Sequence, residues 1–285
     1  MSHNASADVF ALSVGLAAVG TSFASVDILP TADASIGGNA TITAAGISIL
    51  ASHGFDEADA ATDRGARASA EASGGGLVSG QGAAPTAKSN AEVTASVGAG
   101  GNLIISGNID LKARIRNFAT ADTEVFSFGA AAVGATVTEA EANGSATATF
   151  SGDVTSANDI TIEAKSFNAA SAVGEAAAGG LLGALTINSS ISRANPTVSA
   201  SIGNNTDIAS AQNITILADG RTESDARVKG TAIGGLFGAG ASDAEAYANA
   251  TVSSTIGDGS VITVSGTVTI SAIGKPVDPV NEKHR

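Results

Sequence analysis

Short strings in which apolar and polar residues alternate recur at nearly constant intervals along the chain. They read ISILA from Ile47, IDLKA from Ile109, ITIEA from Ile160, ITILA from Ile214 and VTISA from Val268, at intervals of 62, 51, 54 and 54 residues. Alternation with a period of two is typical of a half-buried β-strand. The first and third positions are therefore predicted to face a core; they are Ile47, Ile49, Ile109, Leu111, Ile160, Ile162, Ile214, Ile216, Val268 and Ile270.

A second string precedes each of these and ends in glycine. The clear copies are ADASIG, VTASVG, VSASIG and VSSTIG, which end at Gly37, Gly98, Gly203 and Gly257, and ATATFSG is a looser copy that ends at Gly152. The segments that follow are rich in Asn, Asp and Gly, the residues that turns favour. We predict that the five glycines are structural positions of a repeat, each followed by a turn and one short strand.

A third segment, rich in Gly and Ala, opens each unit; AGGLLGA from Ala178 and IGGLFGAG from Ile233 are two copies. The three segments together predict a single array over 1–272, with units 1–51, 52–113, 114–164, 165–218 and 219–272. The second unit is the longest, and GQGAAPTAKSN from Gly80 is predicted to be its inserted surface loop. Residues 273–285 leave the pattern and are predicted to be a mobile tail.

The architecture that fits this pattern is all-β, because the chain has many β-branched residues and no sustained helical period. Units of this length stack on their neighbours rather than fold alone. We predict a repetitive, elongated β-solenoid with two or three coils in each unit. The alternative is a stacked sandwich or prism of antiparallel strands. In either case Phe10, Phe126, Phe128 and Phe237 are expected to pack inside.

Composition narrows the possible functions. The chain has no Cys, which excludes disulfides and thiolate metal sites, and it has one Tyr and no Trp. Its net charge is −13, from 14 basic and 27 acidic residues, which opposes binding to nucleic acid and to anionic membranes. No apolar run is long enough to span a membrane as a helix. We therefore expect neither a nucleic-acid partner nor membrane insertion.

Three groups of residues in the sequence could suggest a catalytic or phosphate-binding site. GGLLG lacks the Lys and adjacent Ser/Thr of a phosphate-binding loop, and its recurrence favours close backbone packing. Acidic residues lie near one another in DEADAATD (56–63) and at Glu139 and Glu141, as in glycosidases; their alternation with Ala favours a solvated strand face. His3, His53 and His284 lie far apart in the sequence. No catalytic residue and no cofactor is predicted.

Calcium is the one metal that the sequence suggests. NNTD supplies Asn204, Asn205 and Asp207, and GDGS supplies Asp258 at the matching point of the next unit. Turns rich in side-chain oxygen can bind Ca²⁺. The nonapeptide and EF-hand binding patterns are absent, and turn chemistry alone also explains these residues.

The unit combines a Gly-Ala opening, an A-N-x-T-V-S-A-S-I-G middle and an I-T-I-x-A close. In this it resembles the repeat regions of large bacterial secreted filamentous adhesins of the fusobacterial leukotoxin type and, more loosely, filamentous-haemagglutinin-like solenoids. The resemblance covers nearly the whole chain up to Ala272. It implies a β-structured stalk on the bacterial cell surface or outside the cell.

The expected function is that of a non-enzymatic structural segment of a surface fibre or adhesin stalk. Its expected partners are neighbouring repeats of a parent protein or other copies that join it end to end into filaments. A glycan or protein on a host or neighbouring cell is a further candidate partner. The alternative is a carbohydrate-binding or polysaccharide-degrading β-solenoid, although one Tyr and no Trp make an aromatic sugar platform hard to build.

Overall fold

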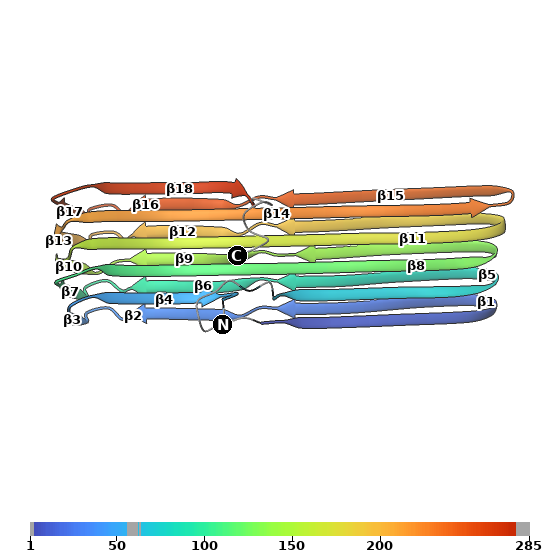
Figure 1. Cartoon of the computed structure of the whole chain (residues 1–285), viewed down its shortest axis with the longest axis horizontal. Helices are drawn as coiled ribbons and strands as arrows, with labels where there is room; N and C mark the ends of the chain where they lie inside the picture. The colour runs from blue at the N-terminus through green and yellow to red at the C-terminus, as the bar shows by residue number, and fades with distance from the viewer. Residues whose placement is uncertain (1–2, 56–61, 63, 278–285) are drawn as a thin grey trace.

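The computed structural model describes residues 3–55, 62 and 64–277, and this part of the chain is all-β. Every strand pairing in it is parallel, so the fold is a parallel β-solenoid and the antiparallel alternative is wrong. Figure 1 shows the coils stacked one above another from the N-terminal to the C-terminal end. The part described contains no helix that could cross a membrane.

Each repeat unit makes one coil, not the two or three coils expected. The closing residues of the units, Ala51, Ala113, Ala164, Ala218 and Ala272, are successive partners across adjacent strands. Rungs of a parallel sheet are about 4.8 Å apart, so the stack is short, and the length of the molecule lies along the strands. We refer to the units as coils one to five. The unit is long because each strand is long, not because the chain turns several times.

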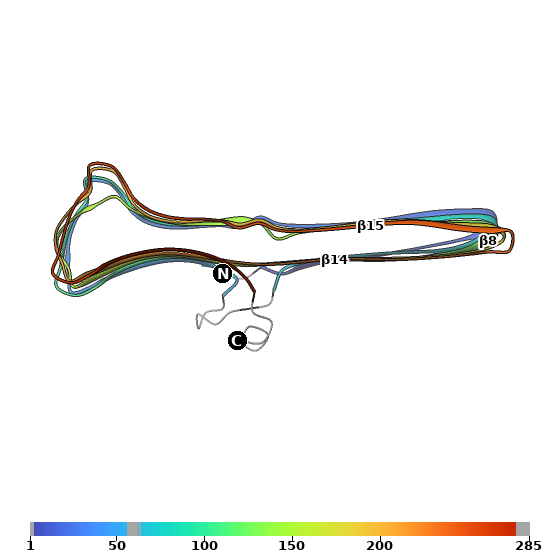
Figure 2. The same ribbon diagram turned by 90° about the horizontal axis from the view of Figure 1, so that it is seen from above.

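Long strands wrap around one end of every coil (Figure 2). They pair in the order β1, β5, β8, β11, β14 and β18, while β4 pairs with β8 and β15 pairs with β11. Their bounds are β1 Ala5–Ile28, β4 Ile47–His53, β5 Ala66–Ser89, β8 Ile109–Glu141, β11 Asp159–Ala194, β14 Asn213–Gly234, β15 Phe237–Ala248 and β18 Val268–Pro276. Because β18 continues to Pro276, residues 273–276 belong to the sheet and not to the mobile tail that was predicted for them. Residues 278–285 lie outside the described part.

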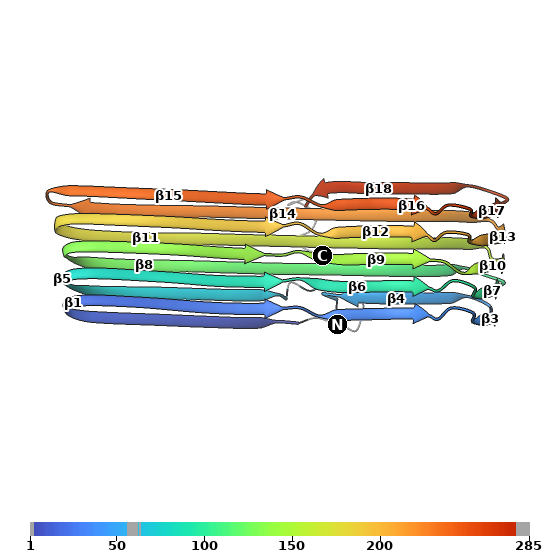
Figure 3. The same cartoon turned by 180° about the vertical axis from the view of Figure 1, so that it is seen from behind.

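Two sheets of short strands complete the other end of the coil, as seen from behind in Figure 3. The first contains β2 Thr31–Ile36, β6 Ala91–Val97, β9 Gly144–Phe150, β12 Thr197–Ile202 and β16 Thr251–Ile256. The second contains β3 Thr41–Ala44, β7 Asn102–Ile105, β10 Asp153–Ser156, β13 Asp207–Ala211 and β17 Val261–Val264. These strands lie where the sequence predicted a glycine-terminated string, a turn and one short strand.

The coil has a wide half and a narrow half, seen edge-on in Figure 2. The wide half, which we call the body, holds a core of Ile, Leu, Val, Ala and Phe150. The narrow half, which we call the arm, consists of residues 5–28, 66–89, 119–142, 170–194 and 224–248, and its apolar core is almost entirely Ala. Small side chains let the two layers of the arm approach each other closely.

The extra length of coil two lies elsewhere than predicted. In the sequence, residues 54–65 separate His53 from Ala66, whereas only residues 116–118 separate their partners Ile115 and Ala119 in the next coil. The segment from Gly80 is instead part of β5 and keeps register with β1 up to Ser89. Its Gly, Ala and Pro85 resemble a loop in sequence, but the narrow arm requires small residues at these positions.

Candidate functional site: the coil-stacking faces

The predicted core positions form columns that run through the stack. Ile109, Leu111, Ile160, Ile162, Ile214 and Ile216 are at most 1% exposed. Ile49 is 8% exposed and Ile47 is half-buried in coil one. The prediction of burial is wrong for Val268 and Ile270, which are 41% and 48% exposed although they keep the register. They lie on the last strand, with no further coil beyond them.

The predicted glycines lie at the corner that follows the first short sheet. The N–H groups of Gly98, Gly203 and Gly257 donate to carbonyl groups of the preceding coil, and Gly37 holds the same position in coil one. Gly152 does not: Phe150 pairs with Val97 and Ile202, so Ser151 is the corner residue of coil three.

The turn after the corner explains this difference. Asn39, Gly100, Asn205 and Gly259 occupy one matching position and have φ between 55° and 73°, a left-handed conformation that Asn and Gly tolerate. Coil three passes from Phe150 to Val154 with a shorter turn that omits this position. The predicted corner residue of coil three, Gly152, is therefore one position too late, because its shorter turn makes Ser151 the corner.

The calcium candidates surround this turn, and several of their oxygen atoms serve the stack. Asn204 Oδ1 accepts the N–H of Asp258 at 2.8 Å, and the N–H of Asp207 donates to Asp153 Oδ1 at 2.9 Å. The N–H of Asn205 donates to the carbonyl oxygen of Asp258 at 2.9 Å. Among the described residues, no three His, Asp or Glu side chains are grouped as metal ligands. Calcium binding at these turns stays a prediction.

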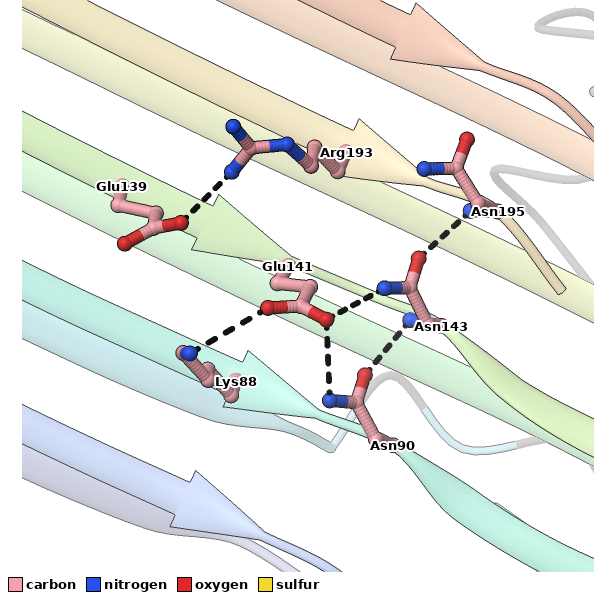
Figure 4. Close-up of polar contacts among 7 residues, drawn as sticks. All are labelled: Lys88, Asn90, Glu139, Glu141, Asn143, Arg193 and Asn195. Carbon is pink, nitrogen blue, oxygen red and sulfur yellow. Dashed lines mark hydrogen bonds and ion pairs between the residues drawn. The ribbon is translucent and has the colours of Figure 1, made fainter.

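An asparagine ladder crosses four coils just before the first short sheet, and Figure 4 shows its members Asn90, Asn143 and Asn195. The Oδ1 atom of Asn90 accepts the N–H of Asn143 at 2.8 Å, Asn143 Oδ1 accepts the N–H of Asn195 at 2.7 Å, and Asn195 Oδ1 accepts the N–H of Asn249 at 3.1 Å. Sequence reasoning recorded the repeated Ala-Asn pair without recognising the ladder. The signal that could have predicted the ladder is an Asn that recurs at the spacing of the coils.

A column of alternating charge lies two residues before the ladder. Its members in chain order are Asp27, Lys88, Glu141, Arg193 and Tyr247. Lys88 pairs with Glu141 at 3.5 Å, and Arg193 bonds to the neighbouring Glu139 at 2.7 Å. Glu141 Oε1 also accepts Nδ2 of Asn143 at 2.5 Å and Nδ2 of Asn90 at 3.4 Å, as Figure 4 shows. The two suspected acids thus bond to cations and ladder amides.

The remaining titratable candidates are dispersed. Most of the DEADAATD cluster, including Asp56, Glu57, Asp59 and Asp63, lies outside the described residues. The rings of His3 and His53 stack with centroids 5.4 Å apart, a contact that their sequence separation did not suggest. Burial, and secondarily the nearby His3, lowers the pKa of His53 from 6.5 to about 4.

The glycine-rich segments form the tight turn at the far end of the arm. Gly15, Gly76, Gly129, Gly180 and Gly234 are successive partners in one column. A Cβ atom on Gly129 would collide with the carbonyl oxygen of Gly76, and one on Gly76 with that of Gly15. The GGLLG segment is thus placed by close backbone packing between coils.

A cleft of about 370 Å³ on the body contains cationic and aromatic side chains. It is lined by Phe55, Arg114, Ile115, Arg116, Lys165, Ser166, Phe167, Asp219 and Arg221. The Arg116 guanidinium lies 4.2 Å from the ring centroid of Phe167. Carboxylates meet the other cations: Glu163 lies 2.7 Å from Lys165, and Asp219 lies 3.2 Å from Arg221. The cleft could receive a small ligand, but its charges are largely paired.

The two ends of the stack are open where the inner coils are closed. In the column Ile36, Val97, Phe150, Ile202 and Ile256, the inner three residues are at most 1% exposed, and the two outer ones are only partly buried. Both end coils also carry strand edges with no neighbouring coil. A scan against models of protein families finds no match, and neither does comparison with curated proteins or with solved structures.

Proposed function

We propose that this chain is a structural repeat segment of an extracellular or cell-surface bacterial fibre or adhesin stalk. The observation that carries the proposal is that the coil-to-coil interactions repeat through the stack and remain unfilled at both ends. Apolar columns, backbone pairing and the asparagine ladder all act along the stacking axis. A module of this kind gains stability from each neighbour that it acquires.

The partner in this function is another stack of the same kind, either the next repeats of a longer chain or a second copy. Coil five presents Ile256, Ile262 and Ile270 at its open end. The columns of these residues begin in coil one with the partly buried Ile36 and Ile42 and the buried Ile49. Joining the ends would place apolar residues on apolar residues in each column. Asn249 would offer its side-chain oxygen to the next coil.

The extracellular setting is supported by the outer surface. Every outward position of the first short sheet is Ser or Thr except Asp33 and Glu92. Together with a net charge of −13 and no Cys, this hydroxyl-rich face suits a stalk exposed to solvent. The proposal assigns no catalytic residue.

The test is electron microscopy of the purified chain over a concentration series, with sedimentation velocity in parallel. Wild type should form rows of end-joined stacks that lengthen with concentration. Ile256→Asp places a charge on the open end and should abolish this growth. Thr255→Asp adds the same charge to the outward face of the same strand and should leave growth unchanged. End-joining that persists in Ile256→Asp would contradict the proposal.

A carbohydrate-binding role is the second candidate, because the body cleft combines Arg116, Phe167 and Lys165. Acidic polysaccharides are the class that such a cleft would select. Calorimetric titration with polygalacturonate tests it, with Phe167→Ala as the variant that should lose binding. No heat of binding by the wild type would remove this candidate.

A further inference from the structure

Near its end, the arm carries polar side chains inside and its larger apolar side chains outside. In coil three, Ser127 is fully buried between Phe126 and Phe128, which are 41% and 54% exposed. On the returning strand Val137 is 57% exposed, and the flanking Thr136 and Thr138 are 1% exposed. The expectation that the phenylalanines pack inside is therefore wrong for Phe126 and Phe128, and also for Phe10 and Phe237, at 60% and 64% exposed.

Hydrogen bonds explain why the interior of the arm can be polar. Thr123 and Thr138 bond across the two layers at 2.7 Å, and Thr136 donates to Asn188 Oδ1 at 2.9 Å. Ser127 donates to the Ser79 hydroxyl of the adjacent coil at 2.8 Å. Buried hydroxyls are tolerated when paired in this way. The larger apolar residues are left on the outer surface.

These apolar residues gather at the end of the arm. We define the apolar rim as residues 14–19, 75–80, 128–133, 179–185 and 233–239, which share one register across the five coils. Its exposed side chains range from 40% exposure at Val133 to 83% at Leu16. They are Val14, Leu16, Val19, Leu77, Val78, Phe128, Val133, Leu181, Leu182, Ile233, Leu236 and Phe237. Large exposed apolar patches of this kind mark interaction surfaces.

The rim is also free of charge. Residues 9–26, 72–87, 125–138, 176–192 and 230–242 contain no Asp, Glu, Lys or Arg. The whole chain carries a net charge of −13, so two copies repel each other over most of their surface. The rim is a face on which like copies can meet without opposing carboxylates. The same acidity disfavours an anionic lipid surface as the partner.

We propose that the apolar rims of two copies pack against each other, forming a lateral dimer separate from end-to-end stacking. Each Val, Leu, Ile or Phe side chain can remove roughly 60–120 Å² of apolar surface from water. The rim side chains together amount to on the order of 1,000 Å² per copy, and a standard specific interface needs about 800 Å² per partner. The total apolar surface of the rim is therefore comparable in size with one side of such an interface.

The order of side chains along the rim suits a two-fold axis through coil three. At the apex of the turn, Leu16 and Leu77 on one side of Ala130 are matched by Leu181 and Leu236 on the other. A two-fold axis at coil three places Ala130 against its own copy, Leu77 against Leu181, and Leu16 against Leu236. Isologous pairing of this kind closes after two copies, and the small Ala130 lets the two backbones approach.

Sedimentation equilibrium tests the pairing. The end-blocked Ile256→Asp protein should show a monomer–dimer equilibrium, and adding Leu181→Asp, a change at a side chain 76% exposed, should raise the dissociation constant at least tenfold. Leu50→Asp is the matched control, since Leu50 is 42% exposed on the body, and it should leave the constant unchanged. An Ile256→Asp protein that stays monomeric, or equal effects of the two added substitutions, would overturn the proposal.

Cysteine cross-linking tests the axis, because the chain has no Cys of its own. Ala130→Cys should form a covalent dimer under mild oxidation, since the axis brings the two Cα atoms near the ~4.4–6.8 Å that a disulfide spans. Thr155→Cys, in the same coil but on the body, should not. Leu16→Cys should cross-link to Leu236→Cys in a mixture and not to itself. Self-linking of Leu16→Cys would overturn the axis through coil three.

Two further outcomes separate the rival partners. Flotation of wild type with phosphatidylcholine vesicles, lost in Leu181→Asp, would assign the rim to lipid and overturn the dimer. The end-blocking Ile256→Asp should leave the lateral dimer intact, whereas Leu181→Asp should leave end-joined rows intact. The rim proposal and the stalk proposal can therefore fail independently.

Discussion

The backbone N–H of Asn195 donates to the side-chain Oδ1 of Asn143 at 2.7 Å, across 52 residues of chain. The same relationship joins Asn90 to Asn143 and Asn195 to Asn249, so one side-chain amide in each of coils two, three and four accepts a bond from the next coil. Backbone groups at this point lie between the arm and the body, where the first short sheet has not yet begun. The ladder joins the coils between two sheets.

Removing an inner rung of the ladder should destabilise the protein. Asn143→Ala leaves the N–H of Asn195 without its acceptor and removes the bond to Glu141, and we expect a loss of about 1–3 kcal/mol. Asn249→Ala is the control, because its backbone N–H still reaches Asn195; its cost should be within ~0.5 kcal/mol. Urea unfolding measures both. Equal losses would show that the side chain is not part of a ladder.

A methyl group in the glycine column at the rim should be costly inside the stack and harmless at its end. Gly129→Ala brings Cβ against the carbonyl oxygen of Gly76, and the backbone shift should cost about 1–3 kcal/mol. In Gly15→Ala the nearest atom is the oxygen of Ala17 at 3.5 Å, so this change should be neutral or slightly stabilising. Thermal unfolding of the two variants is the measurement. A harmless Gly129→Ala would remove close packing as the reason for the glycines.

The two ends of the Lys88–Glu141 ion pair should not be equivalent. Lys88→Ala removes one partly exposed contact at 3.5 Å and should cost less than about 1 kcal/mol. Glu141→Ala also removes the acceptor of Asn90 and Asn143, and should cost about 1–3 kcal/mol. Urea unfolding of both single variants and the double variant separates the ion pair from the amide bonds. A larger loss for Lys88→Ala would contradict this assignment.

Acid should weaken the fold through His53. Its pKa is about 4 in the folded protein, because burial and His3 disfavour the charged ring, and 6.5 in the unfolded chain. Between pH 4 and pH 6.5 the unfolded chain therefore binds more protons than the folded protein. The contribution of neutral His53 to the free energy of unfolding is complete above pH 6.5 and is lost as the pH falls towards 4. Between pH 7.5 and pH 5 the loss should be about 2 kcal/mol.

The comparison of wild type with His53→Gln isolates this effect from the titration of carboxylates. The variant has no imidazole to protonate, so its free energy of unfolding should fall less over the same pH interval. Urea unfolding at pH 7.5 and pH 5 gives the four values required. A pH dependence that is identical in the two proteins would show that the pKa of His53 does not differ between the folded and unfolded states.

The repeat and its register were readable from the sequence. Ile109, Ile160 and Ile214 were aligned by their spacing, and the same spacing brings them into register as strand partners. This succeeds because a parallel solenoid repeats one environment at each position, so similar residues recur at the length of a coil. The corner glycines followed for the same reason, except in coil three, where the turn is shorter.

Other features required the tertiary structure. Residues 54–65 were not recognised as the insertion, because Gly and Pro85 in β5 also resemble a loop. Alternation in FSFG and TVT shows that neighbouring residues face opposite sides, but not which side is inside. That choice depends on how closely the facing layer packs, and the narrow arm accepts Ser127 and excludes Phe128.

The sequence by itself determined a stack of β-coils, its period and the residues that share each column, because local alternation and turn chemistry repeat in every unit. The tertiary structure decided that each unit makes one coil, that the end of the arm is apolar on the outside, and that asparagines bond between coils. These depend on distances between residues about fifty positions apart. Such distances are set by the packing of whole layers rather than by neighbouring residues in the chain.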